Sequence, residues 1–199
     1  MLDSSSSLSD ILDHTWGLLT RGGADKKHAY HFPYLATYGP MGVQQRTVVL
    51  RKAYASKRIL RCYSDARTQK IADLQQNPIV NWLFYDHGSK EQIRARGRIT
   101  LHQQDALAEE LWDNIPPKGR GDYVGPVPPG THTDHYTDNL PPDFREEPTE
   151  ENTRQGFDNF TVMECEVTTV DYLKLDRNGH LRAQFAWQED RWNSYWTAP

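Results

Sequence analysis

A ten-residue stretch of strictly alternating residue types, 92–101, constrains the fold of this chain more than any other feature. One set of alternating positions is small or apolar: Ile93, Ala95, Gly97, Ile99 and Leu101. The other set is polar, with Arg94, Arg96, Arg98 and Thr100. Successive side chains of a β-strand point to opposite faces, so the pattern predicts a strand with one face in a core and the other in water or on a ligand.

Further strand-like runs predict a mainly β, antiparallel protein. They lie at 30–38, 43–52, 58–63, 79–85, 92–101, 160–175, 180–187 and 192–197. Turn signals at Gly39-Pro40-Met41-Gly42 and Arg177-Asn178-Gly179 separate neighbouring strands. About eight strands, without internal repeats and without alternation of strand and long helix, favour a closed antiparallel barrel.

Three short helices are expected beside the strands, at about 9–23, 64–76 and 104–114. Ser9 or Asp10 would cap the first helix, and Ser64 or Asp65 the second. Asn77-Pro78 would end the second helix, because proline disfavours helical geometry in the residue before it.

The chain is expected to form a single domain, 1–199, with a flexible Ser-rich tail at 1–7. Its 199 residues, of which 37% are hydrophobic, can bury one core and fit one domain better than two. The segment 116–156 holds eight of the twelve prolines and few aliphatic residues. A stretch of this length in a compact domain is usually functional or disordered, so 116–156 is predicted to be a long loop or lid.

Charge and composition exclude several classes of partner. A formal net charge of −4 provides no global basic field for nucleic acid. No run approaches the roughly 18 apolar residues of a membrane helix. Cys62 and Cys165 lack any paired spacing and suit a reducing compartment, so we expect a soluble, cytoplasmic protein. The histidines and aspartates of 132–138 are interpreted as loop residues, without a metal site.

Three segments together predict an anion-binding site. RTVVLR at 46–51 opens a strand with an arginine, and YSDARTQK at 63–70 is a hydroxyl-rich turn leading into a helix. EQIRARG at 91–97 adds a glutamine on a third strand. The N–H groups at a helix N-terminus favour a bound anion, whereas Lys70 in the first helical turn opposes the helix dipole. A lysine in that position therefore favours a bound anion beside it.

In these segments the chain resembles the pyridoxamine 5'-phosphate oxidase-related, FMN-binding split-barrel family. The likeness extends over most of the chain and includes LQQNP at 74–78 and HLR at 180–182 ahead of a W…P ending. It implies the FMN-binding split β-barrel, an antiparallel, Greek-key-like fold with a few short helices. It also implies a homodimer with FMN at the subunit interface.

The resemblance implies how the chain would hold FMN. Arg46 and Lys70 would bind the phosphate, with Tyr63, Ser64 and Thr68 adding hydroxyl or backbone contacts. Val48, Val49 and Leu50 would lie against the isoalloxazine, and Gln92 would hydrogen-bond its polar edge. The predicted cofactor-binding residues are Arg46, Thr47, Val48, Val49, Leu50, Arg51, Tyr63, Ser64, Thr68, Lys70, Gln92 and Arg182.

Arg51, His180 and Arg182 are the predicted catalytic residues. In a regular strand Arg46 and Arg51 lie on opposite faces, so Arg51 is expected near the ring or the substrate. By the same parity His180 and Arg182 share one face of their strand, and in the family the equivalent pair reaches the ring or substrate from the partner subunit. The implied reaction is hydride transfer at the flavin N5 by an FMN-dependent oxidoreductase acting on a small molecule, with NAD(P)H as a candidate donor.

Several departures from the oxidase pattern count against pyridoxamine phosphate as the substrate. Gln69-Lys70 stands where the oxidase has an Arg-Lys pair, and Asn178 stands where it has an arginine. Leu173 replaces the tryptophan that packs on the flavin, and the Tyr/Arg/Ser set that grips the substrate phosphate has no counterpart.

Two other functions stay open. One is a non-catalytic flavin-binding or flavin-storage protein, and the other is a haem-binding split barrel with His180 as an axial ligand. The site residues also have ordinary interpretations, since Arg46 and Arg51 can be strand-edge charges and Lys70 and Gln92 solvated side chains.

Overall fold

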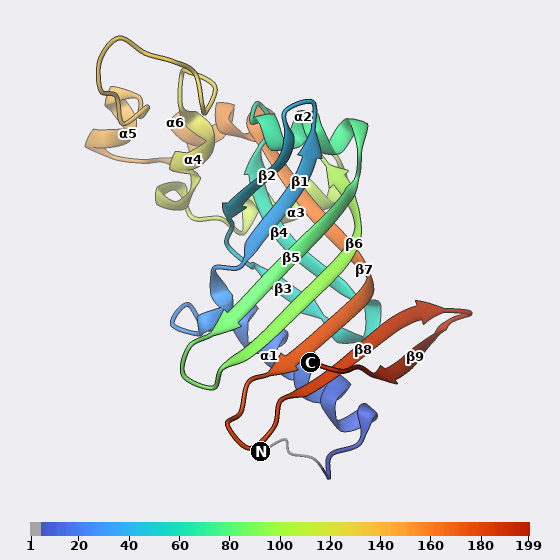
Figure 1. The fold of residues 1–199 in the computed structure, drawn as a ribbon. Helices are drawn as coiled ribbons and strands as arrows, with labels where there is room; N and C mark the ends of the chain where they lie inside the picture. Colours follow the sequence, from blue (N-terminus) through green and yellow to red (C-terminus); the bar gives the residue numbers. More distant parts are fainter. Residues whose placement is uncertain (1–4) are drawn as a thin grey trace.

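The computed structural model describes residues 5–199. Their strands form a single nine-stranded antiparallel sheet (Figure 1). Residues 1–4 of the predicted tail lie outside the described residues. The main path through the sheet is β2-β1-β5-β6-β7-β4-β3, with β8 beside β7 and β9 beside β8. The strands are β1 (Tyr34–Gly39), β2 (Gly42–Thr47), β3 (Lys52–Tyr54), β4 (Ile59–Asp65), β5 (Ile79–Asp86), β6 (Glu91–His102), β7 (Phe160–Lys174), β8 (Leu181–Gln188) and β9 (Arg191–Trp196).

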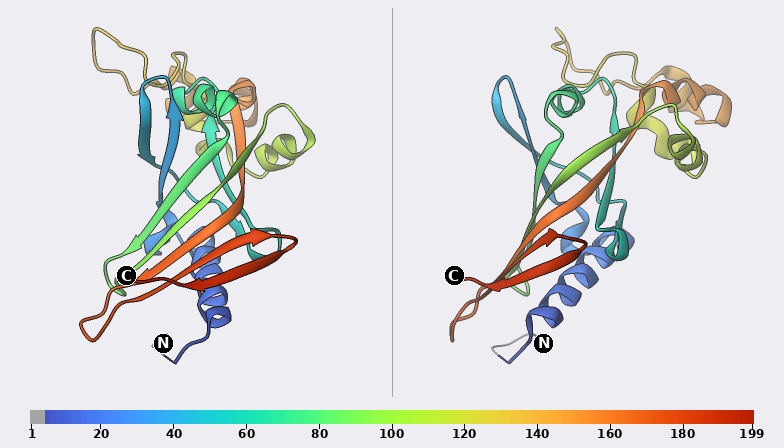
Figure 2. Two further views of the ribbon diagram at one scale, coloured as in Figure 1. Left: turned by 45° about the vertical axis from the view of Figure 1, so that its right-hand side comes forward. Right: turned by 90° about the vertical axis from the view of Figure 1, so that its right-hand side faces the viewer.

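The sheet curls around one main hydrophobic core, and the first helix, α1 (Leu8–Ala24), packs against it. Figure 2 shows α1 lying along the lower part of the barrel, where it contacts β3, β8 and β9. Its buried residues Ile11 and Leu19 join the same core as Leu35, Trp82 and Phe185. The predicted mainly β, split-barrel fold with a few helices is confirmed.

The alternation predicted for 92–101 is present in β6. Ile93, Ala95 and Ile99 are buried, while the arginines between them are exposed. The pairing of β6 with β7 shifts register between Arg96 and Gly97. A Cβ atom on Gly97 would lie only 2.2 Å from the backbone oxygen of Glu166, so only glycine fits at this irregularity.

The predicted strand 43–52 is wrong at its C-terminal half, because β2 ends at Thr47. From there the chain crosses towards the β3–β4 hairpin with its backbone held by other segments. The Val48 N–H donates to the Pro33 carbonyl (3.0 Å), and the Leu50 N–H to the carbonyl of His31 (2.9 Å). Two short 3₁₀ turns flank this region, Ala29–His31 before β1 and Ala55–Lys57 after β3.

The three predicted helices are present, but the second begins only at Gln69, and the predicted caps are wrong. Ser7 caps α1, and Asp10 completes a reciprocal capping box with it (Asp10 N–H to Ser7 Oγ, 3.1 Å). The second helix, α2 (Gln69–Gln76), starts after Thr68, since Asp65 accepts the N–H of Arg67 in a preceding turn. The third, α3 (Ala106–Asp113), is capped by Asp105.

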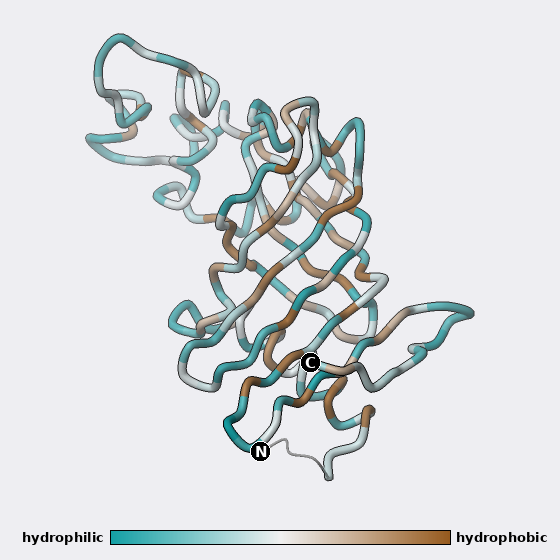
Figure 3. Tube along the Cα trace, viewed as in Figure 1, coloured by the Kyte–Doolittle hydropathy of each residue, from teal (hydrophilic) through white to brown (hydrophobic). Residues whose placement is uncertain are grey.

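The segment 116–156 contains several short helices, which a plain loop would lack. It contains η3 (Pro117–Arg120), α4 (Gly121–Val124), α5 (Pro142–Glu146) and α6 (Glu150–Thr153), followed by η4 (Arg154–Asn159). The buried Arg120 organises it by donating to the carbonyl of Ile115 (2.9 Å) and stacking 4.6 Å from the ring centroid of Trp112. Figure 3 shows a mainly hydrophilic lobe at this segment, beside the barrel end that carries α2.

None of the helices within residues 5–199 combines the length and the apolar character that crossing a membrane requires.

Candidate functional site

Four of the predicted phosphate-binding residues lie together at the α2 end of the barrel; we call Arg46, Ser64, Thr68 and Lys70 the cradle. Lys70, in the first turn of α2, donates from Nζ to Ser64 Oγ (2.8 Å) and Thr68 Oγ1 (3.2 Å). The two hydroxyl oxygens are 3.2 Å apart. The turn between β4 and α2 therefore gathers three polar side chains from within seven residues of sequence.

Arg46 reaches the cradle from β2. Its Nη1 donates to Thr37 Oγ1 at 2.7 Å, and the Thr37 hydroxyl in turn donates to the buried carboxylate of Asp73 at 3.1 Å. Sequence reasoning missed both Thr37 and Asp73. Thr37 lies in an aromatic strand and Asp73 inside a short helix, and neither has a local signal, because they meet only when α2 packs on β1.

The electrostatics of the cradle suit an anion. Burial and the nearby Arg46 guanidinium both lower the pKa of Lys70. Burial also lowers the pKa of Arg46, and Asp73 opposes that effect. Lys70 has only hydroxyl partners in the described residues, and Arg46 a hydroxyl and a carbonyl. Each charge-assisted hydrogen bond from such groups to a phosphate is worth about 1.5–3 kcal/mol.

Arg51 lies beside Tyr63, the sequence neighbour of the cradle residue Ser64, and near Tyr123 of the 116–156 segment. Its guanidinium carbon is 5.2 Å from the ring centroid of Tyr63, and its side chain is exposed. The Tyr63 ring contacts Phe160 edge-on, and Tyr123 from α4 contacts the same phenylalanine in the same way. Arg46 and Arg51 thus have separate surroundings, as predicted, although β2 has already ended before Arg51.

The four residues between Arg46 and Arg51 differ in how far their side chains are exposed. Thr47 is exposed, Val48 and Val49 are half-buried, and Leu50 is completely buried. The Leu50 side chain packs in the main core, and its N–H is already bonded to His31. The Leu50 side chain is thus enclosed by the core, and the predicted contact of its backbone groups and apolar surface with the flavin ring stays a prediction.

Gln92 and Arg182 do not join the cradle. Gln92 pairs with Leu173 across β6 and β7, and Leu173 pairs with Arg182 across β7 and β8. We call Gln92, Leu173 and Arg182 the outer row. They alternate with the buried Ile93, Tyr172 and Ala183, so the outer row faces away from the core, whereas Arg46 contacts the inward-facing Thr37.

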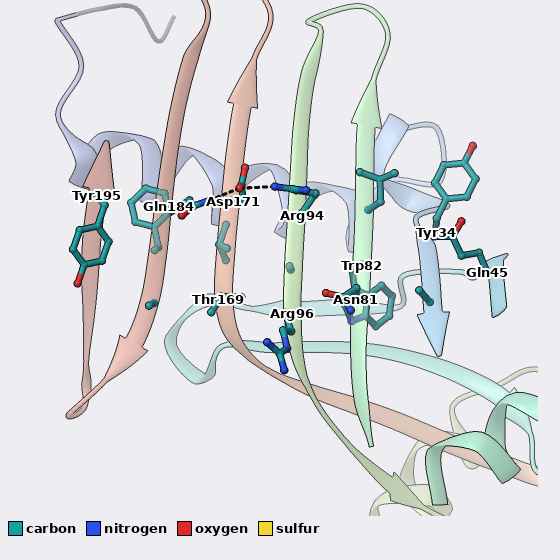
Figure 4. A pocket seen from close by; sticks show the side chains of 16 residues that line it. Tyr34, Gln45, Asn81, Trp82, Arg94, Arg96, Thr169, Asp171, Gln184 and Tyr195 are labelled. Carbon is teal, nitrogen blue, oxygen red and sulfur yellow. Dashed lines mark hydrogen bonds and ion pairs between the residues drawn. The ribbon is translucent and has the colours of Figure 1, made fainter. Parts of the chain in front are cut away.

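A cavity of about 550 Å³ lies on the same outer face, directly beside the outer row. Side chains from six neighbouring strands line it in register: Tyr34, Leu83, Arg94, Asp171, Gln184 and Tyr195. Figure 4 shows Arg94 and Gln184 directed at the carboxylate of Asp171 between them. Sequence reasoning missed Asp171, whose role depends on strands that are far apart in the chain.

The prediction that His180 shares a strand with Arg182 is wrong, because β8 begins at Leu181. It is exposed in the turn before β8, and its Nδ1 accepts the Asp176 N–H at 3.1 Å. The parity argument for a His180–Arg182 pair therefore fails. In the described part of the chain no three His, Cys, Asp or Glu side chains are grouped to hold a metal ion.

Comparison with known proteins identifies the domain. Residues 14–103 match the family described as pyridoxamine 5'-phosphate oxidase, FMN-binding domain. This range contains the whole cradle, Arg51 and Gln92. The predicted cofactor, FMN, is confirmed for this domain type. No curated protein sequence matches the chain.

Solved structures share the fold over nearly the whole chain. A pyridoxamine 5'-phosphate oxidase-related, FMN-binding protein from Nostoc punctiforme has a TM-score of 0.71 and 23% identity, covering 98% of this chain and 99% of its own. PhzG from Burkholderia lata, in complex with tetrahydrophenazine-1-carboxylic acid, has a TM-score of 0.68 and 16% identity, with 99% and 95% covered. Residues 14–103 therefore carry the FMN-binding domain of the pyridoxamine 5'-phosphate oxidase family, as the sequence motifs predict, within a chain that shares its fold with these two structures.

Proposed function

We propose that the chain is an FMN-dependent oxidoreductase that acts on a small molecule as a homodimer, with one flavin at each of two equivalent sites between the subunits. The cradle is the observation that carries this proposal. It holds two half-buried cations, Arg46 and Lys70, near enough for Arg46 to lower the pKa of Lys70, and neither has an ion-pair partner in the described residues of this FMN-binding domain. Like charges held together in this way favour a bound anion.

The cradle residues fit the phosphate group of FMN. Arg46 and Lys70 supply charge and N–H donors, and Ser64 and Thr68 supply hydroxyls at 2.8 and 3.2 Å from Lys70 Nζ. Thr68 also precedes the first turn of α2, where free backbone N–H groups attract an anion.

The need for two copies follows from the two faces of the sheet. The cradle lies with the inward-facing Thr37, whereas Gln92 and Arg182 face outward. Residues of both groups can meet one flavin only if the outer row comes from a second copy. Large apolar side chains on the same outer face support this arrangement, because Tyr34 and Tyr195 are 50% and 54% exposed.

FMN, when bound, supplies hydride transfer at N5. The residues of the chain then bind and orient the reactants. Arg51 has no ion-pair partner among the described residues and lies over the ring of Tyr63, the sequence neighbour of Ser64, so we assign it to an anionic group of the substrate. Arg182 of the partner subunit would place a positive charge near the ring, and His180 would reach the substrate from its exposed turn.

The substrate class is a small anion other than pyridoxamine phosphate. Leu173 and Asn178 stand where the oxidase pattern has a tryptophan and an arginine. PhzG is solved with a ring carboxylic acid, and a carboxylate of that kind matches the single guanidinium of Arg51. The buried free thiols of Cys62 and Cys165 support a cytoplasmic location.

Mixed dimers test the proposal. One subunit carries Arg46→Ala and Lys70→Ala, and the other carries Arg182→Ala; two affinity tags isolate the heterodimer. Each variant alone should bind FMN at least tenfold more weakly, about 1.4 kcal/mol. The heterodimer should recover one site of wild-type affinity, because one intact cradle then faces one intact outer row. Heterodimers that bind no better than their parents would contradict the shared site.

Anaerobic mixing with NADPH or NADH tests the enzymatic part. Bleaching of the flavin absorbance followed by turnover with reducible substrates is expected. Stable flavin binding without any turnover would instead establish a storage protein. An absorbance band at about 400 nm in place of flavin bands would establish the haem-binding alternative.

A further inference from the structure

We infer that Asp171 is a positioning residue, which fixes the guanidinium of Arg182 and limits the positive charge that the outer row presents to the flavin. The inference rests on the proposed function, in which Arg182 serves the site of the partner subunit. It assigns a role to a residue outside the FMN-binding motifs.

The Asp171 carboxylate holds Arg182 through two hydrogen bonds. Arg182 Nε donates to Oδ1 at 3.2 Å, and Arg182 Nη2 donates to Oδ2 at 2.9 Å. The third nitrogen, Nη1, donates to the Ala198 carbonyl near the C-terminus at 3.4 Å. A guanidinium has five N–H donors, so this arrangement fixes its plane and leaves two donors for a ligand.

Two more donors fix Asp171 itself. Arg94 Nη2 from β6 and Gln184 Nε2 from β8 each donate to Oδ2 at 2.7 Å. The Asp171 side chain is 12% exposed, against 52% for Arg94 and 23% for Arg182. The carboxylate is thus the enclosed centre of the network, and the two cations are its exposed edges.

The network around Asp171 carries more positive than negative charge. Burial alone raises the pKa of Asp171, but hydrogen bonds from Arg182, Gln184 and Arg94 overcome this effect and hold it below its usual value. One negative charge therefore faces two positive charges, and the group carries a net charge of about +1 at neutral pH. This excess positive charge lies beside the outer row.

Other ion pairs on β7 differ in this respect. Glu164 pairs with the guanidinium of Arg61, and Glu166 pairs with Arg58. Each of these carboxylates meets one guanidinium, and neither lines the cavity beside the outer row. Glu166→Gln is therefore a matched control, because it removes one negative charge and one ion pair from the same strand.

Asp171→Asn tests the inference through FMN affinity and the midpoint potential of the bound flavin. We expect the FMN Kd to rise at least fivefold, because the guanidinium of Arg182 loses its fixed plane. We also expect the potential to become more positive, since added positive charge favours the anionic reduced ring. Glu166→Gln should leave both values at wild type, whereas a purely structural role would not move the potential.

A double-mutant cycle shows whether Asp171 acts through Arg182. With Arg182→Ala already present, Asp171→Asn should change the Kd by less than twofold. An equal fivefold loss in that background would overturn the inference, as would a wild-type Kd for Asp171→Asn beside a defective Arg182→Ala. Wild-type behaviour of Arg182→Ala would instead show that the proposed site is wrong, and the inference would fail with it.

A second variant tests the inference if the Asp171→Asn protein does not fold. Gln184→Met keeps every charge and removes one of the donors that fix the carboxylate. It should raise the FMN Kd about twofold to threefold, the effect of losing one modest hydrogen bond. A Gln184→Met protein with unchanged affinity and potential would contradict the positioning role.

Discussion

At the residue scale, the charged Lys70 side chain lowers the stability of the flavin-free protein and favours the binding of an anion. Its ammonium group lies half-buried beside Arg46, and both burial and that neighbour lower its pKa. The charged form is thus less favourable in the folded protein than in the unfolded chain. Without a bound anion the cradle costs stability, and a phosphate would remove that cost.

Replacing Lys70 by methionine should therefore separate stability from affinity. We expect the FMN Kd of Lys70→Met to rise at least tenfold, about 1.4 kcal/mol, while the melting temperature of the flavin-free protein stays level or rises. Titration by flavin fluorescence and thermal unfolding measure the two effects. Lys26→Met, at an exposed loop position, is the control and should change neither. A lowered melting temperature with intact affinity would contradict the assignment.

The same group sets a pH dependence for binding. Phosphate affinity needs the protonated Lys70, and its pKa in the folded protein lies below the usual 10.5. FMN affinity should hold at neutral pH and fall as the pH rises through this lowered pKa. Stability without FMN should change in the opposite direction over the same interval, because deprotonation relieves the buried charge. Lys70→Met should abolish both effects, and a wild-type pH profile in this variant would refute the assignment.

At the element scale, the close packing of α2 on the β1–β2 hairpin positions the cradle. Asp73 on α2 accepts hydrogen bonds from Thr37 on β1 and from Gln69 (3.0 Å). Gly39 leaves room for it, since a Cβ atom there would lie 2.1 Å from the Asp73 Oδ1 atom. The hairpin and the helix can approach only because this position has no side chain.

Gly39→Ala should consequently shift α2 and disturb the cradle. We expect a loss of about 1–3 kcal/mol in the free energy of unfolding, as for other overpacked sites, together with weaker FMN binding. Denaturant unfolding and flavin titration measure the two losses. Gly17→Ala is the control, because a Cβ atom on Gly17 meets nothing within 4 Å and alanine favours a helix. Equal stabilities of the two variants would contradict this account of the hairpin.

At the scale of the whole molecule, the two groups of site residues lie on opposite faces of the sheet. Arg46 and Lys70 belong to the cradle, and Arg182 belongs to the outer face. In the dimer that we propose, this division would give each subunit two half-sites, and the symmetric pairing would complete both at once. The exposed Tyr34 and Tyr195 mark the face that we expect to be covered.

A charge in the middle of that face should prevent assembly. Leu83 lies between Tyr34 and Arg94 in the outer register, and Leu83→Arg would set a second guanidinium beside Arg94. We expect a monomer by light scattering, with FMN affinity reduced at least tenfold although the cradle is intact. Thr131→Arg, at the exposed tip of the 116–156 segment, is the control and should remain dimeric. A Leu83→Arg monomer with full affinity would exclude the shared site.

The sequence by itself determined those features that depend on neighbours along the chain. Alternation in 92–101 predicted which residues of β6 are buried, and Asn77-Pro78 marked the end of α2. The cluster of Ser64, Thr68 and Lys70 was predictable because one turn and one helical turn bring these residues together. The resemblance to a known family added Arg46, which no local pattern places there.

Only the tertiary structure decided the contacts that depend on register between distant strands. The bond from Arg46 to Thr37, the row of Gln92, Leu173 and Arg182, and the hold of Asp171 on Arg182 each join separate segments. The irregularity at Gly97 and the early end of β2 also change which residues face each other. A strand pattern states which side of a sheet a residue takes, but its partner is fixed by how the strands slide past one another when the core closes.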